Sequence, residues 1–244
     1  MIIASICKIY MILKELTYIN IRLYLYMSMK LHTISRITNN LLNIVVNYVI
    51  ITSKRLNIDE SHALKHSIDV FNYANNIVES KIQTNPILNK QRDVISVSSL
   101  LHDMCDSKYI LNEPSELNNI DNILIQHMND KDRMAVSNII STISYSKVKK
   151  NGYPNLHEYQ DAYHIVREAD LLSGFDINRC IIFGLKKENL EYTDAVKRAI
   201  DLYDSRMSKY IEDDLFISEY AIKKANELNN QSKYDISVLQ KLIF

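Results

Sequence analysis

The sequence predicts an all-α protein, and three features of the chain support this fold class. Glycine and proline number only three each among 244 residues, so the turn residues that separate strands in sandwiches and barrels are scarce. Apolar residues recur at intervals of three and four along most of the chain, which is the spacing of an amphipathic helix. Neither an alternation of strand and helix patterns nor an internal repeat is present. We therefore expect a bundle of helices around one apolar core.

The length of the chain, 244 residues, fits one domain with an appendage and allows a substantial core to be buried. Residues 1–30 are apolar and rich in tyrosine, but charged residues interrupt them at Lys8, Lys14, Glu15 and Arg22. Hence no run of about 20 apolar residues is available there to cross a membrane. We expect two parts, an N-terminal extension with a leading helix at 1–55 and a helical domain at 56–244.

The first two helices are predicted from apolar spacing and from capping residues. Residues 37–53 carry no charge, and apolar side chains recur there at Leu41, Ile44, Val45, Tyr48 and Val49. A second helix is expected at about 60–80, with Asp59 as its N-cap and Glu60 in the first turn, where the helix dipole favours an acid. One side of that helix carries His66, Val70, Ala74 and Ile77. The side chain of His66 is therefore expected to point toward the interior.

The remaining helices are delimited by turn signals. Thr84-Asn85-Pro86 and Asn151-Gly152-Tyr153-Pro154 mark two breaks in the pattern, and Pro114 ends a further loop. Helices are expected in between at about 90–105, 117–128, 131–145 and 156–176. The C-terminal part also has helical spacing, at about 179–187, 190–211, 213–229 and 233–243.

Charge and cysteine content argue against several classes of protein. The formal net charge is zero and the pI is about 7.0, so nothing global attracts the chain to nucleic acid or to an anionic membrane. A small cluster of cations, Lys147, Lys149 and Lys150, is expected in a solvated loop, with a local phosphate contact as the alternative. The three cysteines (Cys7, Cys105 and Cys180) form no CxxC pair. This pattern predicts neither a disulfide framework nor a cysteine zinc site, and it favours a reducing, cytoplasmic compartment.

The dipeptide His102-Asp103 is the most informative functional signal in the chain. It stands at the polar end of an apolar run, and His66 upstream and Asp170 downstream extend it to an ordered set of two histidines and two carboxylates. Taken singly, an inward histidine is more often a core residue, and a lone aspartate more often caps a helix or forms a salt bridge. An inward carboxylate without a partner is costly to bury, however. Three helices that each place such a group at the edge of an apolar run predict a shared metal ion.

The mixed nitrogen and oxygen donors of this set suit Mn²⁺, Fe²⁺, Mg²⁺, Co²⁺ or Ni²⁺ in six-coordinate geometry. Such an ion lowers the pKa of a bound water, which yields a nucleophile near neutral pH. We expect one ion, because the histidines that would be needed for a second are scattered along the chain. Among them (His127, His157 and His164), His127 is the best candidate for a second ion.

These segments resemble the HD superfamily of metal-dependent phosphohydrolases. The stretch His62 to Val70 resembles the first histidine motif, with His66 at the ligand position. Leu100 to Tyr109 is similar to the LLHDIxDxKF form of one branch, which contains nucleotide pyrophosphohydrolases. Ile139 to Tyr145 resembles the I-x-x-I-S-F segment of that branch, and Ile165 to Leu172 resembles its closing motif, with Asp170 as the last ligand. The resemblance extends over about residues 58–185.

The resemblance implies an HD-domain-like helical bundle that hydrolyses a phosphoester or phosphoanhydride, most often of a nucleotide. It also implies that the ligands of one divalent ion are His66, His102, Asp103 and Asp170. The chain departs from the branch at Ser173, where an acid is usual, and at Glu168, where an aspartate is common. After the pair it carries Met104-Cys105-Asp106 in place of the Gly-Lys of many members.

Several neighbouring residues are candidates for catalysis or for substrate binding. Asp106 lies one turn beyond the pair and is expected, with Asp103, to take part in catalysis as a general acid or base, although capping a loop is an equal alternative. Candidates for contacting substrate are His62, Lys108 and Arg167. Arg167 lies three residues before Asp170 on nearly the same helical face, and a salt bridge with Glu168 or Glu158 is its alternative role. Arg206 and Lys209 are weaker candidates for a phosphate contact.

Two other functions are weighed against the hydrolase. One is a catalytically degenerate HD module that senses a ligand or binds a partner protein, which Ser173 and the unmatched N-terminal segment motivate. The other is a plain helical interaction bundle, which is favoured only if the four ligand side chains are spread apart. The expected partner is a small phosphorylated substrate, a nucleotide by preference. The sequence determines neither the exact substrate, nor the natural metal, nor the oligomeric state.

Overall fold

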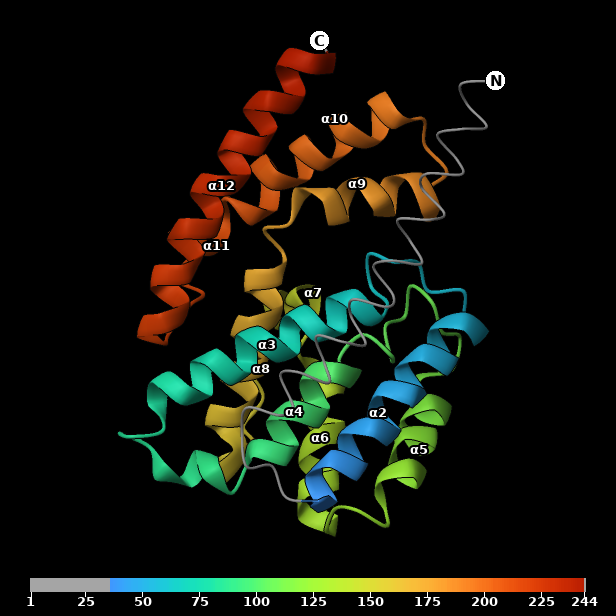
Figure 1. Ribbon diagram of the computed structural model, residues 1–244, viewed down its shortest axis with the longest axis vertical. Helices are drawn as coiled ribbons and strands as arrows, with labels where there is room; N and C mark the ends of the chain where they lie inside the picture. The colour runs from blue at the N-terminus through green and yellow to red at the C-terminus, as the bar shows by residue number, and fades with distance from the viewer. Residues whose placement is uncertain (1–35, 244) are drawn as a thin grey trace. The chain divides into compact units, whose positions relative to one another are not determined.

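The computed structural model describes residues 36–243, and every regular element in that range is a helix (Figure 1). The all-α prediction is therefore confirmed. The chain divides into two compact units, Met1–Leu41 and Leu42–Phe244, and the description below concerns the second. The predicted extension at 1–30 lies outside the described residues. None of the helices described combines the length and the apolar character that a membrane span requires.

The described residues form a series of α-helices joined by short turns. The helices are α2 (Arg36–Arg55), α3 (Leu64–Lys81), α4 (Arg92–Leu101), α5 (Glu113–Leu124), α6 (Asp130–Thr142), α7 (Tyr145–Asn151), α8 (Gln160–Ser173), α9 (Ile177–Lys186), α10 (Tyr192–Leu202), α11 (Lys209–Glu212) and α12 (Glu219–Ile243). Short 3-10 turns occur at Pro86–Asn89 and His157–Tyr159, and a π-helical turn, Tyr203–Met207, joins α10 to α11.

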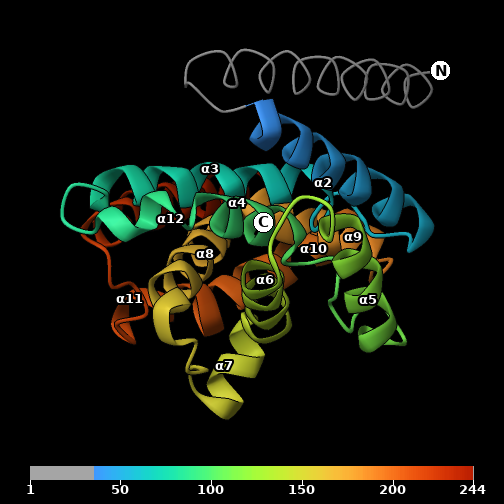
Figure 2. The same cartoon turned by 90° about the horizontal axis from the view of Figure 1, so that it is seen from below.

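The core is built where α3, α4 and α8 pack against one another (Figures 1 and 2). Every residue of α4 from Val94 to Leu101 is buried, so this helix has no solvent-facing side and is surrounded by α3, α6 and α8. In α8 the residues from Ile165 to Ala169 are buried without interruption. Because α3, α4 and α8 each carry or precede a predicted metal ligand, their packing sets the geometry of the site.

The helix α9 lies unusually close to α10, and glycine allows this approach. A Cβ atom placed on Gly184 would lie 3.1 Å from the Cβ of Ala195, a tighter contact than side chains normally make. The close pairing of α9 with α10, and the π-helical turn that follows, bring three arginines of the C-terminal half to one cavity, namely Arg179, Arg198 and Arg206.

The start of α3 differs from the sequence-based expectation. The helix begins at Leu64 rather than near residue 60, and its N-cap is Ala63, which makes no side-chain capping bond. Asp59 instead accepts the Ser61 N–H at 3.0 Å and the Tyr109 hydroxyl at 2.7 Å. The predicted cap was wrong because the carboxylate is used by a turn before the helix and by a distant tyrosine.

Helix bounds elsewhere were also corrected by the tertiary structure. The segments predicted at 213–229 and 233–243 form one helix, α12, since Ser232 between them donates to the carbonyl oxygens of Leu228 and Phe175 instead of ending the helix. The predicted helix at 131–145 ends at Thr142, and the lysines expected in a loop belong to the separate helix α7, which Ser144 caps.

The buried carboxylate of Glu168 ties α8 to the beginning of α12. It accepts hydrogen bonds from the backbone N–H of Ile217 at 2.7 Å and of Ser218 at 3.2 Å, and from the Ser218 hydroxyl. The Ser218 Oγ in turn accepts the N–H of Ala221 at 3.3 Å. Glu168, a position at which the chain departs from the HD branch, is thus a structural residue that satisfies the first turn of α12.

We expect Glu168→Ala to lower the free energy of unfolding by about 3 kcal/mol, because the backbone N–H of Ile217 and the buried donors of Ser218 lose their acceptor. Urea denaturation followed by circular dichroism measures this loss. Glu158→Ala, at an exposed position, is the control and should change stability by less than about 0.5 kcal/mol. Equal effects of the two substitutions would show that the carboxylate of Glu168 does not hold α12 in place.

Candidate metal centre

The four predicted metal ligands converge from three places in the fold. His66 lies near the start of α3 with its side chain only 1% exposed, so the predicted inward orientation is confirmed. His102 and Asp103 follow the end of α4 at Leu101, and Asp170 lies one turn before the end of α8. The predicted helix at 90–105 ends four residues early. His102 keeps right-handed helical backbone dihedrals, and tight turns replace the α-helix beyond it. The side chains of His102 and Asp103 both reach the ring of His66.

The distances between the donor atoms suit a single ion. The Nε2 atoms of His66 and His102 are 2.9 Å apart. Asp103 Oδ2 lies 3.1 Å from Nε2 of His66 and 3.3 Å from Nε2 of His102, and Asp170 Oδ1 lies 3.5 and 3.6 Å from the same two atoms. Donors at right angles around an ion with bonds of about 2.1 Å would be about 3.0 Å apart. His66, His102 and Asp170 could therefore hold one divalent cation of the kind that accepts nitrogen and oxygen, with Asp103 beside them.

Hydrogen bonds behind the ligands direct the correct nitrogen of each histidine inward. Nδ1 of His102 donates to the carbonyl oxygen of Ser99 at 2.8 Å, which leaves Nε2 free to accept an ion. Nδ1 of His66 contacts the hydroxyl of Ser173 at 2.8 Å. Ser173, which replaces the acid usual in the HD branch, therefore orients a ligand histidine in this chain.

Charge coupling within the cluster shifts the pKa values of its members in opposite directions. Burial alone raises the pKa of Asp103 and of Asp170, but the positive charge and hydrogen bonds of the histidines outweigh burial and hold both pKa values well below 3.8. Burial alone lowers the pKa of His102, and the two carboxylates outweigh it, so this pKa is well above 6.5. Without an ion, the cluster therefore carries a proton on His102 between two carboxylates.

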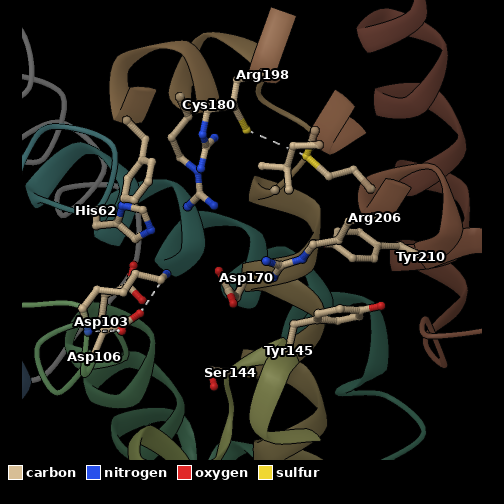
Figure 3. Close-up of a pocket in the computed structure, with 16 residues that line it drawn as sticks. His62, Asp103, Asp106, Ser144, Tyr145, Asp170, Cys180, Arg198, Arg206 and Tyr210 are labelled. Carbon is tan, nitrogen blue, oxygen red and sulfur yellow. Dashed lines mark hydrogen bonds and ion pairs between the residues drawn. The ribbon is translucent and has the colours of Figure 1, made fainter. Parts of the chain in front are cut away.

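A solvent-accessible cavity of about 170 Å³ opens beside the ligand cluster. Figure 3 shows His62 and Asp106 on the side of Asp103, and Arg206 extending toward Asp170 beside the rings of Tyr145 and Tyr210. The cations that line it are Lys108, Arg179, Arg198 and Arg206. Acidic side chains that would hold a cation and basic side chains that would hold an anion thus face one space.

Three further predicted site residues lie at this cavity. His62 is in the turn before α3, where its Nδ1 contacts the Ser61 hydroxyl at 2.6 Å, and burial lowers its pKa to about 3. Asp106 accepts the backbone N–H of Lys108 at 2.8 Å and its ammonium at 3.0 Å. Asp106 and Lys108 thus form a pair at the edge of the cavity, and His62 presents a neutral ring to it.

Arg167 and the weaker candidate Lys209 do not join the other predicted site residues, and Lys209 pairs instead with Glu212 at 2.7 Å. The place of Arg167 is the more informative of the two. Its guanidinium lies over the ring of Tyr153 at 4.9 Å and lines a neighbouring cavity. Three residues along a helix differ in direction by about 60°, which is enough to turn Arg167 away from the side of α8 that carries Asp170. Its contact with Glu168, 3.8 Å between Nη2 and Oε1, is too long for a hydrogen bond.

The histidines considered for a second ion stay outside this cavity. Neither His127 nor His157 nor His164 lines it. Within residues 36–243, the one group of potential ligands whose donor atoms all lie within 4.8 Å of one another consists of His66, His102 and Asp170. The described structure thus offers one candidate centre.

Sequence reasoning missed two arginines of the cavity. Nη1 of Arg179, in α9, lies 2.6 and 2.7 Å from the two ring nitrogens of His66. Arg198, in α10, donates to Glu188 at 2.7 Å and stacks on Phe183 at 4.9 Å. The available signal for Arg179 was its place at the start of the predicted helix at 179–187, the next helix along the chain after the one that carries Asp170.

Comparisons with protein-family models, with characterised proteins and with solved structures give no match for the chain. The resemblance to the HD superfamily therefore rests on its quoted motifs and on the ligand geometry. That geometry supports a metal site formed by His66, His102 and Asp170, beside which Asp103 stands.

We predict that Mn²⁺ affinity rises roughly tenfold per pH unit, and that this rise continues above pH 6.5. The sign follows from His102: its pKa is raised above 6.5 in the metal-free protein, so an ion must displace a proton from Nε2, and a higher pH makes this displacement easier. Isothermal titration calorimetry in buffers of different ionisation enthalpy should detect about one proton released per ion. His164→Gln, outside the cavity, should leave the pH dependence unchanged, whereas affinity that is constant between pH 6.5 and 8 would contradict the assignment.

Proposed function

We propose that the chain is a metal-dependent phosphohydrolase of the HD type, which cleaves a phosphoester or phosphoanhydride, preferably of a nucleotide. The observation that carries the proposal is the convergence of His66, His102, Asp103 and Asp170 within a few ångströms at the wall of a cavity. A plain interaction bundle is favoured only if these four side chains are spread apart. Their donor atoms instead lie 2.9 to 3.5 Å from Nε2 of His66.

The residues around the cluster have the properties that hydrolysis at this place would need. A divalent ion bound by the four ligands would supply Lewis acidity and would activate water near neutral pH. Asp106, held by Lys108, faces the same cavity and can accept or return a proton. His62 is uncharged at neutral pH because burial lowers its pKa to about 3, so it can orient substrate or water by hydrogen bonding without adding charge.

The cationic wall of the cavity favours an anionic substrate. Neither Arg179 nor Arg206 forms an ion pair with a carboxylate within residues 36–243, and both line the cavity. Guanidinium groups bind phosphate oxygens with two parallel hydrogen bonds. We infer that these two arginines receive the phosphate groups of the substrate.

Aromatic side chains next to these arginines support a nucleotide as substrate. The rings of Tyr145 and Tyr210 both line the cavity, with centroids 5.4 Å apart. The guanidinium of Arg206 lies 4.4 Å from the ring of Tyr145. A planar base could stack against such a surface while its phosphates reach the ligand cluster.

A second candidate function is a catalytically degenerate HD-type module that senses a ligand or binds a partner protein. One observation favours it: Nη1 of Arg179 lies 2.7 Å from Nε2 of His66, the atom that faces the other ligands. A guanidinium at this place would compete with a divalent ion for the same nitrogen. If Arg179 replaces the ion, the wild-type protein should bind no Mn²⁺, and Arg179→Gln should restore binding.

The hydrolase proposal predicts that Asp103→Asn lowers Mn²⁺-dependent phosphate release by at least about 1,000-fold, since a ligand and its charge are lost. Asp106→Asn should keep Mn²⁺ bound but reduce kcat about 100-fold, because only proton transfer is impaired. The assay is phosphate release from nucleoside mono-, di- and triphosphates and from p-nitrophenyl phosphate.

The matched control for these variants is Asp161→Asn. It changes a half-exposed aspartate that pairs with Lys81, and it should leave the rate of phosphate release unchanged. Failure of the Mn²⁺-loaded wild-type protein to release phosphate from any of these compounds would refute the hydrolase. Stoichiometric Mn²⁺ binding without turnover would then support the degenerate module.

The proposed role of Arg206 predicts a selective effect on substrate binding. Arg206→Gln should raise KM about tenfold, corresponding to about 1.4 kcal/mol, with kcat little changed, since the side chain would contact phosphate before and during the reaction equally. Arg133→Gln is the control, because Arg133 is held by Asp121 and Asp130 elsewhere on the molecule. A fall in kcat at constant KM would contradict a role in ground-state binding.

A further inference from the structure

The side chain of Arg167 poses an energetic problem that the metal centre does not resolve. The side chain is only 3% exposed, and its Nε and Nη2 atoms have no hydrogen-bond partner within residues 36–243. The nearest carboxylate, Glu168, already accepts hydrogen bonds from Ile217 and Ser218 and lies 3.8 Å from Nη2. A buried guanidinium without acceptors is costly, so its position calls for an anionic or polar partner.

A cavity of about 260 Å³ lies against this arginine. Its walls are largely apolar and consist of Ile143, Tyr145, Val148, Tyr153, Leu171 and Leu215. The charged residues that line it besides Arg167 are Lys149 and Asp213, both of them exposed. An engineered cavity of about 150 Å³ is enough for benzene, so this one has room for a single ring that bears a small substituent.

We propose that this cavity is a binding site for a small carboxylate with an aromatic or branched apolar body, and that the carboxylate pairs with Arg167. The planar guanidinium matches the two oxygens of a carboxylate, and the apolar walls match the body. A group with a single negative charge suits the site, because the carboxylates of Glu168 and Asp213 stand close by and would repel a doubly charged phosphate. The proposal does not depend on the hydrolase function.

The position of this site gives its occupant a contact with the metal cavity. Tyr145 lines both cavities, and its ring carries the guanidinium of Arg206 at 4.4 Å. Arg167 itself lies one turn from Asp170 in α8. A molecule that fills this cavity would therefore contact Tyr145, whose ring also forms part of the wall of the metal cavity.

The test uses a matched pair of probes, para-(trifluoromethyl)benzoate and the uncharged para-(trifluoromethyl)benzyl alcohol, with fluorine NMR as the readout. The full-length protein should broaden the benzoate signal saturably and bind the alcohol at least tenfold more weakly. Arg167→Met keeps an apolar stem but removes the charge, and it should weaken benzoate binding at least tenfold while alcohol binding stays unchanged. Lys131→Met, which removes one charge from an exposed position outside this cavity, should leave benzoate binding unchanged.

Each alternative result of this experiment overturns the proposal. No saturable benzoate binding, equal binding of the two probes, or equal binding to the wild type and Arg167→Met would each show that Arg167 is not a carboxylate receptor. If circular dichroism shows that Arg167→Met does not fold, Tyr153→Ala carries the test, since it removes a half-exposed ring on which Arg167 stacks. That variant should also bind benzoate at least tenfold more weakly, and unchanged binding would again refute the proposal.

Discussion

The site depends on the contacts among four ionisable side chains where α3, α4 and α8 meet. These are His66, His102, Asp103 and Asp170. Two imidazoles and two carboxylates stand here at the edge of the apolar core, with the histidines almost completely shielded from solvent. Charged groups in such a place are tolerated only when they compensate one another or share an ion. The opposite pKa shifts of His102 and the two aspartates are the signature of that compensation. The proposed ion would replace a proton in an arrangement that already balances its charges.

The helix α8 connects most of the functional features of the molecule. Its side chains point in several directions. Asp170 faces the ligand cluster, Arg167 faces the second cavity, and Glu168 binds the chain at the beginning of α12. Ser173, at its end, contacts the ring of His66. A helix that is buried over most of its length holds these groups in fixed relation. Glu168 and Ser173, the two positions at which the chain differs from the HD branch that it resembles, therefore have structural partners.

The C-terminal helices supply the second half of the proposed active site. The proposed ligands come from α3, the turn after α4, and α8, whereas the arginines come from α9, α10 and the π-helical turn after α10. Acidic and basic walls thus meet across one cavity, as recognition of a phosphate beside a cation requires. Arg179 also contacts Nε2 of His66, the nitrogen that an ion would need. Measuring Mn²⁺ binding therefore distinguishes the hydrolase from a degenerate module in which Arg179 replaces the ion.

The sequence by itself determined the helical fold class, the inward orientation of His66 and the ordered ligand pattern, because these depend on local spacing and on the cost of burying charge. It misjudged the start of α3 and the end of α4, because Asp59 and the residues after Leu101 make contacts that local propensity does not include. Only the tertiary structure decided that Arg179 and Arg206 join the ligands and that Arg167 does not. The direction of a long side chain depends on which helices pack beside it, and a spacing of three residues still allows two faces to diverge.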